Sequence, residues 1–378
     1  MALITTAGES ISGAIFMVLY LASGYWRNWR VLLSRPWTVP LLVLISLNFL
    51  GLLWTTDLHR GFIVVSKLNY FLFSFAGATL PWTKRYFRWV VLSFLTGLSI
   101  AFVIGVFQFF NLLPGLPTNP VVGPTGFADS NVLNLALTTG LLWIVYDLKY
   151  REVFSPIYNI VLGSAFFTYL VLTGGRTGQV VFFLLFPVAL IILLPGKWKG
   201  VKILGGIALC IIIFISSPVV RQRYSSGMND LEAYKNGFAT TNLGLRLVFW
   251  QGAFKMAMES PIFGVGTGDY GIKMTELQKR NSIPQTPGID KFDNPHNSYL
   301  AYFSGLGIIG LASLLWFLYA VSREAFEKWD SPAGWFKLCY LGIFLLGSIM
   351  DTLMWGHDHA FALAIITAIP NNIFFSKK

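Results

Sequence analysis

Three segments of the sequence carry residues that can hold a phosphate or move a proton. Arg176 stands in the glycine-rich turn Thr173–Gly178, Arg246 stands among apolar residues, and His296 precedes a long apolar run. A guanidinium presents a fork of N–H donors that fits phosphate oxygens. An imidazole is suited to act as a general base near neutral pH. These residue types together predict phosphate binding combined with proton removal.

Each of these residues also has a simpler interpretation. Arg176 could be a solvated loop arginine, and Arg246 could reach lipid headgroups from an interfacial helix. His296 could belong to a turn that anchors the chain at the membrane interface. Its neighbour Asn297 could cap the following helix or contact a substrate. The residues alone leave these alternatives open.

Lys67 lies within an apolar run, where a charge costs roughly 2.5–3.5 kcal/mol on insertion scales. It is therefore expected to face a polar cavity or to extend toward the interface. His59 and Arg60 stand near the same end of that run. We treat these three residues and Asn297 as possible substrate contacts.

No pattern in the sequence requires a metal or a cofactor. His357, Asp358 and His359 could bind a metal, but no second group of ligands is evident, which favours a hydrogen-bonded turn. The stretch Gly264–Asp269 lacks the Lys-Ser/Thr of a P-loop and is interpreted as a tight turn. The absence of an Asp-x-Asp pair argues against chemistry on metal-bound nucleotide sugars, so we expect neither metal nor cofactor.

The composition indicates a membrane protein. Of the 378 residues, 55% are hydrophobic and 12% charged, and the mean hydropathy is +0.63. Soluble domains carry roughly 25% charged residues, too many to match this chain. Cys210 and Cys339 both fall in apolar runs, so no disulfide is expected.

Apolar runs long enough to cross a bilayer recur along the chain, and in lipid such runs must be helical. The sequence thus predicts an all-α polytopic membrane protein with about eleven or twelve transmembrane helices. We place eleven, at 8–25, 37–55, 61–80, 89–112, 131–147, 156–173, 178–195, 201–217, 297–320, 333–350 and 358–374.

Lys and Arg residues gather on alternate connections, which are expected to be cytoplasmic. The opposite short loops hold only Arg60 and Arg176. The N-terminus and the segment 218–296 are then expected outside and the C-terminus inside; no cleavable signal peptide is apparent. Because the basic residues are spread over many short loops, nucleic-acid binding is disfavoured. The cytoplasmic set is Arg27, Arg30, Arg35, Lys84, Arg85, Arg88, Lys149, Arg151, Lys197, Lys199, Lys202, Arg323, Lys328, Lys337, Lys377 and Lys378.

The chain therefore divides into transmembrane helices at 1–217, a periplasmic loop at 218–296 and further transmembrane helices at 297–378. Within the loop, 243–258 is predicted to be an amphipathic helix that lies along the membrane interface. Its expected apolar stripe, at helical spacing, consists of Leu243, Leu247, Trp250 and Phe254.

Taken together, the order of these motifs resembles the bacterial O-antigen ligase family, within the superfamily shared with O-antigen polymerases and protein O-oligosaccharyltransferases. The resemblance covers about 170–315. It rests on the glycine-rich turn with Arg176, the Leu-Arg-Leu helix with Arg246, Ser260–Gly266, Pro295–Leu300 and Gly305–Gly310. It implies a GT-C-like helical fold, commonly with twelve spans and both ends cytoplasmic.

The resemblance also implies an activity at the periplasmic face of the bacterial inner membrane. A glycan on undecaprenyl diphosphate would be moved to the lipid A–core oligosaccharide, with inversion and without a metal. Arg176 and Arg246 would hold the diphosphate, and His296 would be the general base. The expected partners are this lipid-linked donor, the lipid A–core acceptor and the lipid bilayer.

Three alternatives remain. The same donor could serve an O-antigen polymerase or a protein O-oligosaccharyltransferase. A transporter of lipid-linked sugars is a more distant possibility, because such proteins tend to show internal repeats and charges deep in their spans, whereas this sequence shows no repeat and few such charges. A non-enzymatic scaffold would use the arginines and the histidine only structurally.

Overall fold

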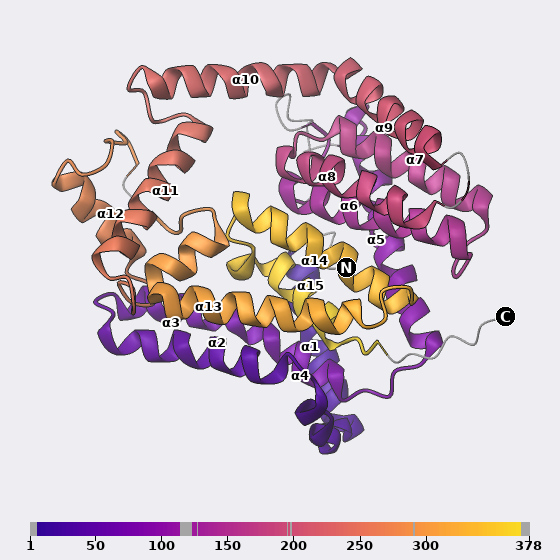
Figure 1. Ribbon diagram of the computed structural model, residues 1–378, viewed down its shortest axis with the longest axis horizontal. Coiled ribbons are helices and arrows are strands. Elements are labelled where there is room, and N and C mark those ends of the chain that lie inside the picture. The colour runs from indigo at the N-terminus through magenta and orange to yellow at the C-terminus, as the bar shows by residue number, and fades with distance from the viewer. Residues whose placement is uncertain are drawn as a thin grey trace.

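The computed structural model describes residues 6–113, 123–126, 128–194, 196, 199–289 and 292–371, and the regular elements in these residues are all helices (Figure 1). The predicted all-α fold of a multi-pass membrane protein is confirmed. Lys197, Lys377, Lys378 and the last three residues of the predicted span 358–374 lie outside the described residues.

The chain before the long loop forms helices that are broken more often than the hydropathy suggests. In chain order they are α1 (Thr6–Ser23), η1 (Tyr25–Ser34), α2 (Thr38–Leu50), η2 (Gly51–Trp54), α3 (Leu58–Ser66), η3 (Lys67–Phe71), α4 (Leu72–Ala78), α5 (Lys84–Phe109), α6 (Ser130–Tyr150), α7 (Pro156–Leu172), α8 (Arg176–Leu193) and α9 (Lys199–Ser216).

The rest of the chain contains the loop helices and the last membrane helices. These are α10 (Pro218–Lys235), α11 (Asn242–Glu259), α12 (Tyr270–Lys279), α13 (Ser298–Phe326), α14 (Pro332–Met350), η4 (Leu353–Trp355) and α15 (His357–Ala368).

The number of membrane-crossing helices differs from the predicted eleven. In the described part of the chain seven helices are long and apolar enough to cross a membrane, or eight if the pair Tyr25–Ser34 and Thr38–Trp54, bent by 100°, counts as one span. The other predicted spans correspond to the shorter apolar helices Ser10–Ser23 and Pro156–Leu172 and to the twelve-residue α15. The hydropathy of the sequence locates each apolar run but does not show where a helix bends or ends before the run does.

Aromatic and aliphatic side chains form a continuous core between the membrane helices. Helix α14 lies at its centre, packed against α6, α8, α13 and α15, while α13 also runs along α2 (Figure 1). Trp143, Phe336 and Phe344 are among the fully buried side chains of this core. This core fixes the end of α14, at Met350, relative to the ends of the neighbouring helices.

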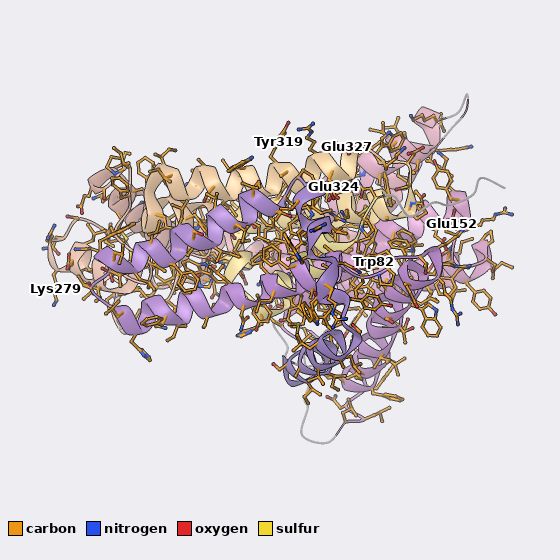
Figure 2. All side chains as sticks on the ribbon, turned by 90° about the horizontal axis from the view of Figure 1, so that it is seen from below. Trp82, Glu152, Lys279, Tyr319, Glu324 and Glu327 are labelled. Atoms are coloured by element: carbon orange, nitrogen blue, oxygen red, sulfur yellow. The ribbon has the colours of Figure 1, made fainter. Side chains whose placement is uncertain are left out.

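A buried group of charged residues lies toward one end of the molecule. Lys279 of the loop lies at one end and Glu152, which follows α6, at the other (Figure 2). Toward the end with Glu152, Arg35 and Lys337 both bind the carboxylate of Glu324, at 2.9 and 3.0 Å. Arg35 and Lys337, both predicted to lie on cytoplasmic connections, are buried, and Lys337 lies within α14; the side of the membrane that they face stays a prediction. Both cations share the one carboxylate of Glu324, a long-range contact that the spacing of residues in the sequence does not indicate.

The loop helices pack into a small apolar cluster of their own, formed around Val248, Met256, Met274 and Phe292. The predicted helix at 243–258 is confirmed as α11, which lies at a steep angle to α13 (Figure 1). Its packed face is not the predicted stripe, because Phe254 is exposed. The buried face combines larger apolar residues with small ones: Gly244, Val248, Phe249, Gly252, Ala253, Met256 and Ala257. The small residues allow α11 to approach its neighbours closely.

The stretch Gly264–Asp269 is a structural joint, as the tight-turn interpretation expected. Gly266 N–H donates to the Gly305 carbonyl at 2.9 Å, and a Cβ at Gly264 (φ +68°) would meet the backbone of Gly305 at 2.4 Å. The Asp269 carboxylate accepts bonds from the Thr56 amide and hydroxyl and from the Asp57 amide. The joint thereby ties the loop to α13 and to the segment before α3.

Candidate active site

His296 and Asp351 form a pair where α13 begins and α14 ends. His296 Nδ1 lies 3.1 Å from Asp351 Oδ1, although the residues are 55 positions apart in the chain. We assign the proton to Nδ1, because a carboxylate can only accept a hydrogen bond. Nε2 then carries the lone pair. This arrangement leaves His296 able to take a proton from a substrate hydroxyl.

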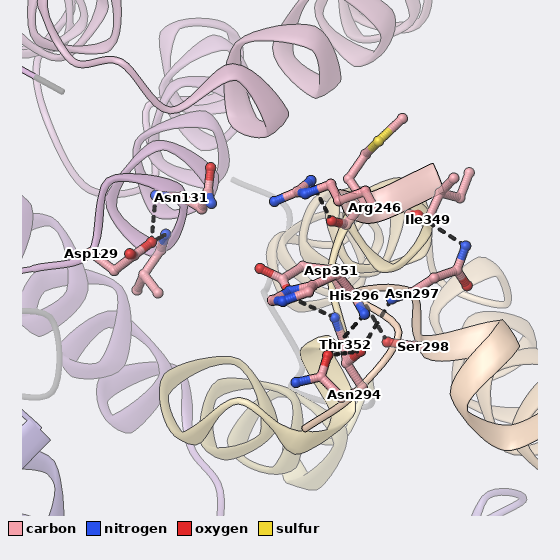
Figure 3. Close-up of polar contacts among 12 residues, drawn as sticks. Asp129, Asn131, Arg246, Asn294, His296, Asn297, Ser298, Ile349, Asp351 and Thr352 are labelled. Atoms are coloured by element: carbon pink, nitrogen blue, oxygen red, sulfur yellow. Dashed lines mark hydrogen bonds and ion pairs between the residues drawn. The ribbon is translucent and has the colours of Figure 1, made fainter. Parts of the chain in front are cut away.

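The backbone holds the imidazole in place. His296 adopts a left-handed conformation (φ +50°), which non-glycine residues seldom adopt. Its N–H donates to Asn294 Oδ1 at 2.9 Å, and its ring stacks on Phe249 with a 6.0 Å centroid distance. Asn294 Oδ1 also accepts from the Thr352 hydroxyl. The histidine is therefore fixed from its own loop, from α11 and from the end of α14 (Figure 3).

Asn297 has the capping role expected for it. Its side-chain oxygen accepts the Leu300 N–H at 2.9 Å, and its Nδ2 donates to the Ile349 carbonyl at 3.0 Å. The residue is buried, and its amide is used within the protein. This bonding favours a positioning role over direct substrate contact.

Arg246 reaches the same helix end from α11. Its Nη1 donates to the Met350 carbonyl at 2.7 Å, one residue before Asp351 (Figure 3). Burial is the largest influence and lowers the pKa of Arg246, as does the charge of Arg176, whereas Asp351 and Asp129 raise it. A guanidinium stays protonated despite such a shift. The positive charge of Arg246 is therefore available to a bound anion.

Asp351 was not among the site residues predicted from the sequence. Burial is the largest influence on it and raises its pKa, but the hydrogen bond and charge of His296, the Thr352 N–H and the charge of Arg246 together outweigh it. The pKa of Asp351 consequently lies below its ordinary value. Asp351 is thus ionised at neutral pH and pairs electrostatically with both His296 and Arg246.

Arg176 is the first residue of α8, and glycines bring its turn against α6. A Cβ at Gly175 would lie 2.1 Å from Asn134 Nδ2, and one at Gly178 would lie 2.5 Å from the Asn134 backbone. Thr173 Oγ1 donates to Asn134 Oδ1 at 2.9 Å. The glycines are thus needed for packing as well as for turning. The Arg176 side chain extends toward α10, where Nη1 lies 3.2 Å from the Cβ position of Gly227.

A second acidic residue faces this space from α6. Asp129 caps that helix by accepting from the Asn131 and Val132 N–H groups. Figure 3 shows Asp129 at the start of α6, on the side opposite Arg246 and Asp351. The effects of Asp129 and Arg176 on the pKa of Arg246 place both charges within electrostatic reach of it. The structure therefore brings Arg176, Arg246 and His296 to one end of the bundle.

Two of the weaker candidates line a separate small cavity beside this site. Arg60, Lys67, Asp293 and Asn294 line a space of about 150 Å³. Asn294 connects the two places, because it also holds His296. Arg60 pairs with Asp293. Lys67 lies at the junction of α3 and η3 and faces this polar cavity, which is one of the two positions expected for it. His59 is exposed on α3 and does not line the cavity.

The histidines near the end of the chain have other contacts. His357 contacts the Tyr70 hydroxyl, and the His359 backbone carbonyl accepts from the Tyr340 hydroxyl at 2.9 Å. Among the residues that the structure describes, no three His, Cys, Asp or Glu side chains gather as a metal site would require.

Residues 161–315 match the family model described as O-antigen ligase. Over these residues the chain resembles the O-antigen ligase family. The matched segment contains Arg176, Arg246 and His296, while Lys67, Asp129 and Asp351 lie outside it.

A curated relative agrees with this assignment. The chain is 25% identical over 250 residues to an O-antigen ligase of Escherichia coli (strain K12). The alignment covers 64% of this chain and 58% of the relative, so the chain spans less than two thirds of the relative's length. These two similarities point to the same family, that of O-antigen ligases.

Proposed function

We propose that this protein transfers a glycan from undecaprenyl diphosphate to a sugar hydroxyl of the lipid A–core oligosaccharide, at the periplasmic face of the bacterial inner membrane. The observation that carries the proposal is the His296–Asp351 pair, which lies beside Arg246 and at the same end of the bundle as Arg176. A base beside two fixed cations fits a reaction that removes a hydroxyl proton while a diphosphate departs.

The reaction is a single displacement. The acceptor oxygen forms a bond to the anomeric carbon while the bond from that carbon to the diphosphate oxygen breaks, which inverts the anomeric centre. His296 Nε2 takes the hydroxyl proton, and the diphosphate leaves with the bonding electrons. Arg176 and Arg246 stabilise its charge, a role for which the proposal needs no metal. The nearby cavity with Arg60 and Lys67 would receive polar groups of a substrate.

The acceptor is tested by offering each candidate to the purified protein with one undecaprenyl-diphosphate-linked glycan. The acceptors are lipid A–core, a second lipid-linked glycan and a protein bearing the hydroxyl sites of an oligosaccharyltransferase. The proposal predicts product only on lipid A–core. Product on the growing glycan would identify a polymerase, and product on the protein an oligosaccharyltransferase. Movement of the donor across vesicles without any product would identify a transporter.

Asp351 is expected to position His296 and to stabilise its protonated form. Asp351→Asn should therefore lower kcat about 10- to 100-fold with little change in donor binding, and Asp351→Glu should restore part of the activity. Activity against pH distinguishes this role, because without the carboxylate the protonated imidazole is less favoured, so the acidic limb of the profile should move to lower pH. Equal loss in both variants with an unchanged profile would make Asp351 merely structural.

The same carboxylate predicts a pH dependence of stability. Because folding lowers the pKa of Asp351, its ionised form stabilises the protein above the ordinary aspartate value of about 3.9. That contribution is lost as the pH falls through the lower folded-state pKa. In detergent, the Tm values of wild type and Asp351→Asn should differ at neutral pH and converge in acid below that pKa.

A further inference from the structure

A large apolar cavity lies among α1, α4, α5 and α15, away from the candidate active site. Its volume is about 710 Å³, and Phe16, Phe73, Gly77, Tyr86, Val90 and Phe361 are among the residues that line it. Pockets for small molecules commonly measure about 300–1,000 Å³. The lining is almost wholly apolar, so the space suits a hydrocarbon chain and is unsuited to a glycan or a diphosphate.

The cavity lies at the end of α5 that is distant from the active site. Tyr86 and Val90 are in the first two turns of that helix, whereas Gln108 near its far end accepts the Gly126 N–H close to Asp129. A helix of 26 residues is roughly 40 Å long. Trp82, which also lines the cavity, lies in the same half of the molecule as Glu152 and Glu324 (Figure 2). The cavity therefore lies toward the end of the bundle with Glu152, opposite the candidate active site.

Exposed cations stand close in the sequence to residues that line the cavity. Arg27 and Arg30 follow the lining residue Tyr25 on η1, and Arg85 precedes the lining residue Tyr86 on α5; all three arginines are exposed. The Trp82 indole is fixed by its hydrogen bond to the Gly77 carbonyl at 2.8 Å. Tryptophan and tyrosine rings gather at the level of lipid headgroups, and basic residues there attract anionic lipids.

We propose that this cavity binds an acyl chain of an anionic phospholipid from the cytoplasmic leaflet, with the headgroup phosphate held by Arg27, Arg30 and Arg85. The apolar lining selects a hydrocarbon chain, and the three arginines select the negative headgroup. A prenyl chain would fit the lining equally well, but the diphosphate-binding arginines of the donor site lie at the opposite end of the bundle. The three exposed arginines near the lining residues therefore favour the phospholipid.

Trp82 provides a probe of occupancy. The full chain is placed in phosphatidylcholine vesicles containing brominated phosphatidylglycerol or brominated phosphatidylcholine, and tryptophan quenching is compared with that of Trp82→Phe to isolate the share of Trp82. The brominated anionic lipid should quench this share at a lower mole fraction than the zwitterionic lipid. Removing Arg27 and Arg30 as Arg→Gln should reduce the preference about fivefold for each arginine.

Two matched variants test the cavity itself. Val90→Phe narrows it and should reduce quenching of Trp82, whereas Val103→Phe on the same helix, at an exposed position, should not. Equal quenching by both lipids, or unchanged quenching in Val90→Phe, would overturn the proposal. So would undecaprenyl phosphate displacing the brominated lipid more readily than phosphatidylglycerol does. If Val90→Phe does not fold, the exposed arginine variants decide the question.

Discussion

Replacing His296 with alanine is expected to lower glycan transfer about 100- to 10,000-fold, the usual contribution of a positioned general base. The reason is geometric: Asp351 fixes the imidazole through Nδ1, so Nε2 is the group that can take the acceptor proton. The measurement is kcat for transfer from an undecaprenyl-diphosphate-linked glycan to lipid A–core. Binding of undecaprenyl diphosphate should change little, because the arginines hold the diphosphate.

The variant must remain folded for this result to be informative. His296 makes its backbone bond to Asn294 through its own N–H, which alanine keeps. His296→Asn is a useful companion, because asparagine tolerates the left-handed backbone better than most residues but cannot act as a base. Both variants should elute as the wild type does from a sizing column and bind donor. Turnover at the wild-type rate in either one would exclude His296 as the base.

The second large effect is expected at Arg246. Arg246→Ala should lower kcat about 100- to 1,000-fold, as losing one preorganised donor to a developing negative charge commonly does. It should also weaken binding of undecaprenyl diphosphate. Arg246→Lys should rescue little, because a lysine cannot bond the Met350 carbonyl and present further fixed donors to an anion at the same time.

Arg280 supplies the matched control. It lies in the same loop segment, is exposed and pairs with the surface carboxylate of Glu276, so Arg280→Ala should keep both binding and turnover. Arg176→Ala should behave like Arg246→Ala. If both site variants bind donor normally and the control behaves identically, the two arginines are structural and the scaffold alternative is favoured.

The sequence predicted those parts of the site that lie in local motifs. Pro295 and Asn297 indicated where α13 begins, and the cap at Asn297 is present. The helix around Arg246 was also predicted, with the wrong buried face. The buried face is made by Val248, Phe249 and Met256 with glycines and alanines between them, and the large side chain of Phe254 is exposed.

Asp351 was missed because its role depends on a contact that spans 55 positions. In the sequence it is a single carboxylate after an apolar run, which is typical of a solvated helix end. Only the packing of α13 against α14 brings it to His296. The same limitation explains Lys337, which resembles a loop charge in the sequence but is buried with Glu324. Long-range ion pairs leave no pattern in the spacing of one chain.

A structure of the protein in a lipid nanodisc with an undecaprenyl-diphosphate-linked sugar bound, carrying Asp351→Asn to slow turnover, is the most direct measurement. Our account predicts diphosphate oxygens within hydrogen-bonding distance of both Arg176 and Arg246. It also predicts that His296 Nε2 faces the anomeric carbon from the side opposite the diphosphate. A diphosphate that contacts neither arginine, or a sugar bound beyond the reach of His296, would contradict it.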